Sequence, residues 1–100
     1  MTIQSNATAS YEVTILVPVY NEEDNMRALS ARLSAYLPGA GKRSCVLFIN
    51  DGSTDGSGAL IREACREHED FFFLEFTRNC GLSAALKAGM DAALSPYIAY

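Results

Sequence analysis

Asp51 is the residue of this sequence with the strongest potential for chemistry. It follows the apolar run 45–49 and Asn50, and it precedes a polar stretch over residues 52–58. An acid at the end of a buried strand lies at the edge of a sheet, where its carboxylate can accept hydrogen bonds from a ligand's N–H or hydroxyl groups. A base imide or a ribose would suit it. The same residue could instead form an Asx-turn with Ser53 or cap the next helix, and the local sequence leaves both interpretations open.

Two other apolar runs also lead directly into residues that could contact a ligand. Residues 18–22 follow the first run and contain Tyr20 and Glu22, while residues 77–81 follow the third and contain Arg78. Tyr20 could stack on a flat base or lie at the surface with its hydroxyl in water. Glu22 could bind a ligand or serve as a carboxylate in the first turn of a helix.

Two basic residues are candidates for contacts to a phosphate or a sugar. Arg78 lies in the segment after the third apolar run, and Lys87 lies within a predicted helix. Each could equally be a solvated surface charge. The residue types alone do not decide between the two roles.

The candidates are positioned by alternating strands and helices. Short apolar runs predict strands at 13–17, 45–49, 71–76 and from Pro96 onward. Asn21 is predicted to cap the first helix, with residues 22–24 as its first turn, and the cluster 38–41 ends it. Further helices are predicted around 60–65 and over 82–93.

This order of elements predicts an α/β fold. Strands joined by helices through short connections form right-handed crossovers, which give a mostly parallel sheet with helices on both faces. Ligands of such sheets bind beyond the carboxyl ends of the strands. The three segments that follow the strands are therefore expected to share one rim.

Composition excludes several classes of protein. The chain has 100 residues, of which 49% are hydrophobic, and 8 Lys+Arg against 12 Asp+Glu give a net charge of −4. An apolar content this high rules out a disordered chain, and the acidic balance disfavours a nucleic-acid binder. Neither the G-x-G-x-x-G pattern directly after a strand nor the P-loop pattern occurs.

Cellular location is expected from the N-terminus and the cysteines. Residues 1–12 form a polar leader that resembles neither a signal peptide nor a membrane anchor. Cys45, Cys65 and Cys80 match no zinc or disulfide pattern and are expected to be buried thiols in a reducing compartment. A cytoplasmic protein is therefore predicted, with residues 13–100 forming one domain after the leader.

Three motifs together resemble family 2 glycosyltransferases. They are Val17-Pro18-Val19-Tyr20-Asn21-Glu22-Glu23, then Asn50-Asp51-Gly52-Ser53-Thr54-Asp55-Gly56-Ser57, then Arg78-Asn79-Cys80-Gly81 with Ala85 and Gly89. The third motif is most similar to the branch that transfers a sugar from a nucleotide donor to polyprenol phosphate. Many members carry an aspartate where this chain has Asn50. The resemblance extends from about Val13 to Tyr100.

The resemblance implies a Rossmann-like, nucleotide-sugar-binding half of a GT-A fold. The donor would be a UDP- or GDP-sugar, with Tyr20 against the base and Asp51 accepting a hydrogen bond from it. No residue of the chain is assigned to catalysis or to metal binding. The residues implied in binding the nucleotide sugar are Pro18, Val19, Tyr20, Glu22, Asp51, Gly52, Ser53, Arg78 and Lys87.

The family also implies components that this sequence does not contain. An Asp-x-Asp motif, which would follow a strand such as 96–100, would bind Mg²⁺ or Mn²⁺ at the donor's diphosphate. The chain is therefore expected to be an N-terminal part, inactive alone, of an enzyme at the cytoplasmic face of a membrane. Polyprenol phosphate is the favoured acceptor.

The alternative is a non-catalytic α/β interaction module. In that case the segment 51–54 is only a turn, and the rim of the sheet serves a protein partner or none. An apolar sheet edge at 97–100 could then pair with a second copy of the chain.

Overall fold

The structure is a computed structural model that describes residues 2–3 and 8–100. Strands and helices alternate through most of this length, as the apolar runs predict. In chain order the elements are β1 (Thr2–Ile3), a 3-10 turn (Thr8–Ser10), β2 (Val13–Val19), α1 (Met26–Tyr36), a 3-10 turn (Leu37–Gly39), β3 (Ser44–Asn50), α2 (Ser57–Glu67), β4 (Phe71–Glu75), α3 (Leu82–Ala92) and β5 (Tyr97–Ala99).

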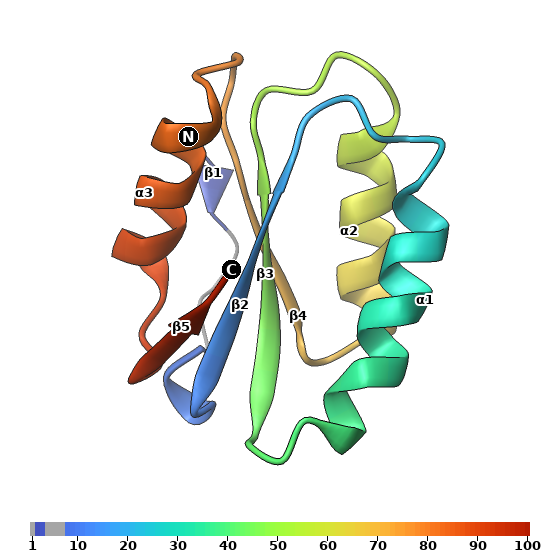
Figure 1. The fold of residues 1–100 in the computed structure, drawn as a ribbon. Coiled ribbons are helices and arrows are strands. Elements are labelled where there is room, and N and C mark those ends of the chain that lie inside the picture. Colours follow the sequence, from blue (N-terminus) through green and yellow to red (C-terminus); the bar gives the residue numbers. More distant parts are fainter. Residues whose placement is uncertain (1, 4–7) are drawn as a thin grey trace.

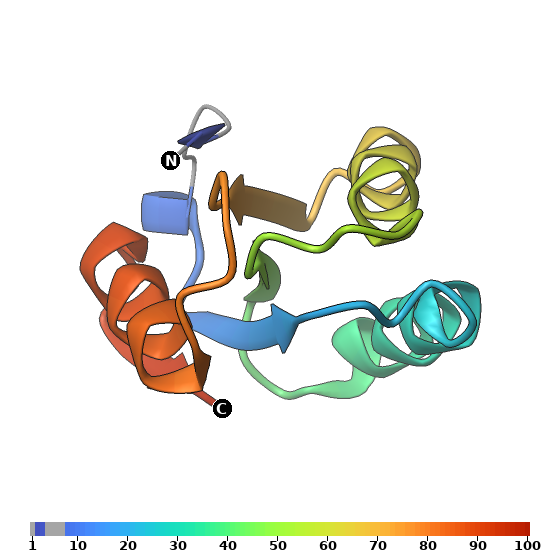
Figure 2. The ribbon, with the colours of Figure 1, turned by 90° about the horizontal axis from the view of Figure 1, so that it is seen from above.

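The strands form one sheet in the order β1-β4-β3-β2-β5. The pairs β4–β3, β3–β2 and β2–β5 are parallel, and β1 runs antiparallel to β4. Helices α1 and α2 cover one face of the sheet and α3 covers the other (Figures 1 and 2). The predicted α/β fold, with a mostly parallel sheet between helices, is confirmed.

The core lies on both faces of the central strand β3, all seven residues of which are buried. Leu47 and Ile49 belong to the cluster on the α3 side, and Val46 and Phe48 belong to the cluster that packs against α1 and α2. A strand buried on both faces has no polar alternation, which is why residues 45–49 form a continuous apolar run. Burial on both sides fixes where β3 ends and where the loop after it begins.

Helix α1 begins later than predicted. It starts at Met26 after Asn25, whereas the sequence suggested a cap at Asn21 and a first turn at residues 22–24. In the structure, residues 22–25 form a turn closed by a 2.9 Å hydrogen bond from Asn25 N–H to the carbonyl oxygen of Glu22. The predicted start was wrong because the N–H groups of this segment bond to the loop after β3 instead.

The described parts of the predicted leader pack against the sheet. Strand β1 adds an antiparallel fifth strand in which Thr2 pairs with Glu75, and Thr8 and Tyr11 are buried. The Tyr11 hydroxyl donates a 2.5 Å hydrogen bond to Asp70, and the Arg43 guanidinium lies 4.7 Å from the centre of its ring. Residues 1 and 4–7 of the leader lie outside the described residues.

Tyr11 is expected to make stability fall at high pH. Burial, and then the hydrogen bond to Asp70 and its charge, raise the pKa of Tyr11 from 10.0 to about 12. The unfolded chain then loses the phenol proton first, so the stabilisation is complete below pH 10 and is lost as the pH rises from 10 to about 12. Urea unfolding across this range should show a difference between the wild type and Tyr11→Phe that shrinks with rising pH.

The Tyr11→Phe comparison also separates Tyr11 from the thiols. Cys45 and Cys65 are buried, as the sequence predicts, and burial raises the pKa of Cys65 to about 12 as well. Both proteins share that thiol, so only Tyr11 can change their difference. A constant difference from pH 10 to 12 would contradict the prediction. The expectation of a buried thiol was wrong for Cys80, which is exposed because it lies in a surface loop.

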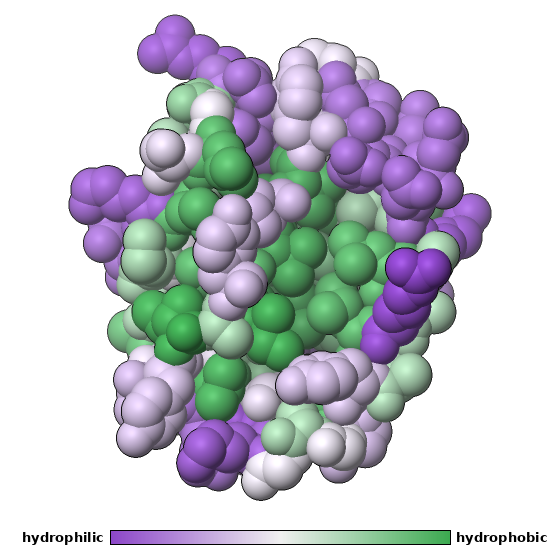
Figure 3. Space-filling view, in the orientation of Figure 1, coloured by the Kyte–Doolittle hydropathy of each residue, from purple (hydrophilic) through white to green (hydrophobic). Residues whose placement is uncertain are grey.

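An apolar surface lies between α1 and α3, over the β2–β5 edge (Figure 3). All three residues of β5 are exposed, and Tyr97 keeps 61% of its surface accessible. Pairing of a second copy along this edge stays a prediction. No helix within residues 2–3 and 8–100 is long and apolar enough to cross a membrane.

Candidate functional site

Three loops meet at the carboxyl ends of the parallel strands, at the top of Figure 1. We call them the first loop (20–25, after β2), the second loop (51–56, after β3) and the third loop (76–81, after β4). Residues of these loops, of the end of β2 and of the start of α3 surround a cavity of about 300 Å³. Its lining consists of Pro18, Val19, Tyr20, Glu22, Asp51, Asn79, Gly81 and Leu82.

Five of the nine residues predicted to bind the nucleotide sugar line this cavity. They come from two separate segments of the chain, and Tyr20 is 46% exposed, so that its ring is accessible to a ligand. The lining combines an aromatic ring, two carboxylates and apolar groups. A small, partly apolar cavity with a few converging polar groups is typical of a ligand site.

Asp51 connects the second loop to the third. Only 4% of its surface is exposed. One carboxylate oxygen accepts a 2.7 Å hydrogen bond from Cys80 N–H, and the other accepts from Gly81 N–H at 3.0 Å and from the Asn79 amide at 3.1 Å. A carboxylate offers about four lone-pair positions, so about one remains for a ligand.

The turn with Ser53, considered above as a local role of Asp51, is formed by Asn50 instead. The Asn50 side-chain oxygen accepts a 3.1 Å hydrogen bond from Ser53 N–H and so closes the turn after β3. Asp51 N–H donates to the carbonyl oxygen of Val19 at 2.8 Å, which continues the pairing of β2 with β3. The carboxylate of Asp51 is therefore available to reach the third loop.

Gly52 and Ser53 support the rim rather than line the cavity. Gly52 has φ +68, and a Cβ built on it would overlap the backbone of Arg78 and Asn79. Glycine therefore lets the second and third loops touch backbone to backbone. The hydroxyl of Ser53 accepts a 3.0 Å hydrogen bond from Asn21 N–H and so fixes the first loop.

The acidic first loop is also fixed by the second loop and by the first residue of α2. Glu22 N–H donates to the Ser57 hydroxyl at 2.8 Å, Glu23 N–H donates to Asp55 at 3.3 Å, and the Glu23 carboxylate accepts from Gly56 N–H at 3.0 Å. Desolvation opposes ionisation of Asp55, but hydrogen bonds from Ser57 and Glu23 outweigh it and hold the pKa of Asp55 below its ordinary value. An ionised Asp55 keeps the two loops together.

The two basic candidates lie outside the lining of the cavity. Arg78 is exposed in the third loop, next to Asn79. Lys87 lies on the exposed side of α3, where its ammonium group pairs with Asp91 at 3.0 Å. Their proposed contacts to phosphate or sugar stay predictions.

Sequence reasoning did not select three residues of the lining. Asn79 and Gly81 were visible in the third motif but had no assigned role, and Leu82 begins α3. The short polar segment after β4 was the available signal, since residues 77–81 contain few apolar side chains. Their approach to Asp51 depends on how β3 and β4 pair, which local sequence does not show.

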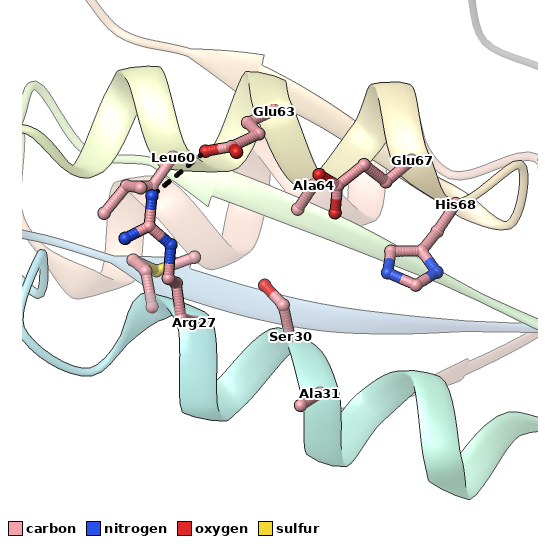
Figure 4. Close-up of a pocket in the computed structure, with 9 residues that line it drawn as sticks. Arg27, Ser30, Ala31, Leu60, Glu63, Ala64, Glu67 and His68 are labelled. Carbon is pink, nitrogen blue, oxygen red and sulfur yellow. Dashed lines mark ion pairs between the residues drawn. The ribbon is translucent and has the colours of Figure 1, made fainter.

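Two other hollows have less suitable positions. A groove of about 250 Å³ runs between α1 and α2, where Arg27 and Glu63 form a 3.5 Å ion pair across it and Ser30 faces α2 (Figure 4). A cavity of about 470 Å³ lies beside Tyr11 and Asp70, at the opposite ends of the strands. Neither lies at the carboxyl ends of the sheet, where α/β proteins bind ligands.

The described residues do not form a metal centre. Among residues 2–3 and 8–100, no three histidine, cysteine, aspartate or glutamate side chains gather closely enough to hold an ion. Asp51 and Glu22 share the cavity, but the oxygens of Asp51 are largely engaged by the third loop. Mg²⁺ or Mn²⁺ would need further oxygen ligands than these loops supply.

Fold and site together define a Rossmann-like α/β domain with a cavity at the carboxyl ends of its parallel strands. Comparison with known proteins narrows this class. The chain belongs to glycosyl transferase family 2, whose family model matches residues 14–100. The resemblance seen in the three motifs is thereby confirmed.

Several curated relatives have names of the polyprenol-phosphate branch. The chain is 39% identical over 82 residues to undecaprenyl-phosphate 4-deoxy-4-formamido-L-arabinose transferase of Aeromonas hydrophila, covering 81% of this chain and 25% of that protein. The protein of the same name from Salmonella paratyphi A is 35% identical over 81 residues, covering 80% of this chain and 25% of its own length. The chain thus spans about a quarter of the length of these relatives.

A solved structure shares the fold. It is the mannosyltransferase PcManGT of Pyrobaculum calidifontis in complex with GDP-Man and Mn²⁺. The TM-score is 0.69 at 25% identity, and the match covers 81% of this chain and 24% of that chain. The GT-A glycosyltransferase architecture implied by the motifs is confirmed for this chain.

Proposed function

We propose that this chain is the nucleoside-binding part of a glycosyltransferase that uses a nucleotide-diphosphate sugar. The observation that carries the proposal is the cavity that brings Tyr20, Glu22 and Asp51 together at the carboxyl ends of the strands. In the reaction, an acceptor oxygen forms a bond to the anomeric carbon of the sugar. The bond from that carbon to the diphosphate oxygen breaks, and the nucleoside diphosphate leaves with the electron pair.

In this proposal the residues of the chain bind and orient the nucleoside end of the donor. The ring of Tyr20 stacks on the base, and the remaining acceptor position of Asp51 receives a hydrogen bond from the base. Glu22 accepts from a ribose hydroxyl. The donor is a UDP- or GDP-sugar, and the GDP-Man complex of the structural neighbour supports this class.

A divalent cation is proposed for the complete enzyme, and the Mn²⁺ in the neighbour's complex supports it. When bound, such an ion neutralises the charge that develops on the leaving diphosphate. The described residues do not gather a complete set of ligands for it. This chain is proposed to bind the nucleoside through the cavity, and its Arg78 and Lys87 are proposed to lie toward the phosphate and sugar.

The proposed acceptor is polyprenol phosphate. The names of the relatives from Aeromonas hydrophila and Salmonella paratyphi A support a lipid phosphate of this kind. A complete enzyme acting on such a lipid would work at the cytoplasmic face of a membrane.

Tyr20→Ala tests the nucleoside site. A base that stacks on an aromatic ring gains about 1–3 kcal/mol, so loss of the ring should weaken binding by about fivefold to a hundredfold. The binding of UDP and of GDP should be followed by titration with ¹H–¹⁵N NMR, which detects weak complexes. Tyr36→Ala is the matched control, because Tyr36 is also exposed but lies at the end of α1.

The titration also distinguishes the proposed function from a non-catalytic interaction module. A nucleoside site requires that amide shifts concentrate in the first and second loops and that Tyr36→Ala binds like the wild type. Equal affinities for the wild type and Tyr20→Ala would remove Tyr20 from the site. If neither diphosphate shifts any loop resonance, the nucleoside site is wrong and the interaction module becomes the better explanation.

A further inference from the structure

Asn21 has an unusual backbone conformation at the rim of the cavity. Its φ is 51, and among the described residues it is the one non-glycine residue with a positive φ. Asparagine visits this left-handed conformation more easily than most residues. The conformation turns the chain between Tyr20 and Glu22, which both line the cavity.

Asn21 bonds to the second loop through both its backbone and its side chain. Its side-chain oxygen accepts hydrogen bonds from Thr54 N–H at 2.8 Å and from Asp55 N–H at 3.3 Å. Its own N–H donates to the Ser53 hydroxyl at 3.0 Å. One residue of the first loop thus holds three consecutive residues of the second.

We propose that Asn21 is a positioning residue that sets Tyr20 and Glu22 in place before the nucleotide arrives. The inference rests on the proposed function, because positioning matters only if this cavity receives a ligand. Glu22 and Tyr20 are exposed, so they would have to be ordered on binding if nothing else held them. The three hydrogen bonds of Asn21 provide that order in advance.

Asn21 contributes in two ways: its backbone adopts the left-handed conformation, and its side-chain oxygen accepts hydrogen bonds. Glycine accepts the left-handed backbone but has no acceptor for Thr54 and Asp55. Aspartate tolerates the same backbone and keeps an acceptor oxygen. Asn21→Gly therefore removes the side-chain acceptor without straining the backbone, and Asn21→Asp restores an acceptor.

The test combines two measurements on the chain. Amide hydrogen exchange without ligand reports whether Thr54 and Asp55 lose protection, which should fall about tenfold in Asn21→Gly and be retained in Asn21→Asp. NMR titration with UDP and with GDP reports affinity. We expect about tenfold weaker binding for Asn21→Gly and affinity within about threefold of the wild type for Asn21→Asp.

Ile61→Val controls for a general loss of stability. Ile61 is fully buried on α2 and does not line the cavity, and loss of one methyl group there lowers stability modestly. A purely structural role for Asn21 predicts that Ile61→Val weakens nucleotide binding as much as Asn21→Gly does. Equal weakening would therefore overturn the proposal, and unchanged affinity in Ile61→Val supports it.

The outcomes separate this inference from the proposed function. If the wild type binds a diphosphate and Asn21→Gly binds equally well, only the positioning role is wrong. If the wild type binds neither diphosphate, the proposed function fails and the positioning role fails with it. Unchanged exchange of Thr54 and Asp55 in Asn21→Gly would refute the contact itself.

Discussion

Substitution of Gly52 by alanine is expected to lower the free energy of unfolding by about 2–5 kcal/mol. Two costs add at this position. A left-handed backbone costs a residue with a Cβ about 1–2 kcal/mol, and Gly52 has φ +68. The new Cβ would also overlap the backbone of Arg78 and Asn79, which cannot rotate away as a flexible side chain could. The second and third loops would have to separate.

Comparison with Gly41→Ala isolates the cost of the steric overlap, because Gly41→Ala carries only the cost of the left-handed backbone. Gly41 has φ +83, but a Cβ there would meet nothing within 4 Å. Urea unfolding of the two variants should therefore show a small loss for Gly41→Ala and a much larger one for Gly52→Ala. Equal losses would mean that the two loops do not touch at Gly52. If Gly52→Ala does not fold, circular dichroism will show this while Gly41→Ala keeps its native spectrum.

Substitution of Asp51 by alanine is expected to cost about 2–4 kcal/mol, because three donors of the third loop lose the buried carboxylate that accepts their hydrogen bonds. The affected donors are the N–H groups of Cys80 and Gly81 and the amide of Asn79. Urea unfolding gives the loss of stability, and amide hydrogen exchange should show that Cys80 and Gly81 lose protection. Asp51→Asn should fall between alanine and the wild type, since one of its two polar atoms can no longer accept.

Asp91→Ala is the matched control for the loss of a carboxylate. Asp91 is exposed and pairs with Lys87, one turn earlier on α3, at 3.0 Å. Such a pair contributes about 0.3–0.5 kcal/mol. If Asp51→Ala cost no more than Asp91→Ala, the connection between the second and third loops would be refuted.

These two predictions bear on how Asp51 would serve in nucleotide binding. Asp51 already holds the third loop, so its substitution affects both the ligand and the loop. A loss of affinity in Asp51→Ala would therefore not by itself identify a direct contact. Tyr20→Ala is the better test of the site, because removal of its exposed ring leaves the connections between the loops in place.

The sequence by itself determined the class of fold and the contents of the rim. A short apolar run such as 45–49 is too short for a helix and apolar on both faces, so it is buried as a strand inside a sheet. The polar segments that follow these strands therefore lie at the edge of the sheet, at the carboxyl ends of the strands. Five predicted residues therefore line one cavity. The fold class and the contents of the rim depend on hydrophobic and polar patterns within short segments, which can be read without knowing how distant segments pack.

Only the tertiary structure decided which hydrogen-bond partners the polar side chains have. Asn21 was expected to cap α1 but bonds to Thr54, 33 residues away, and Asp51 bonds to Cys80, 29 residues away. The position of β1 beside β4 also depends on a distant pairing. A side chain that can cap a helix can also accept from any N–H group of similar geometry, so local pattern leaves the choice open. Packing of the strands decides it, because it brings one set of donors within reach.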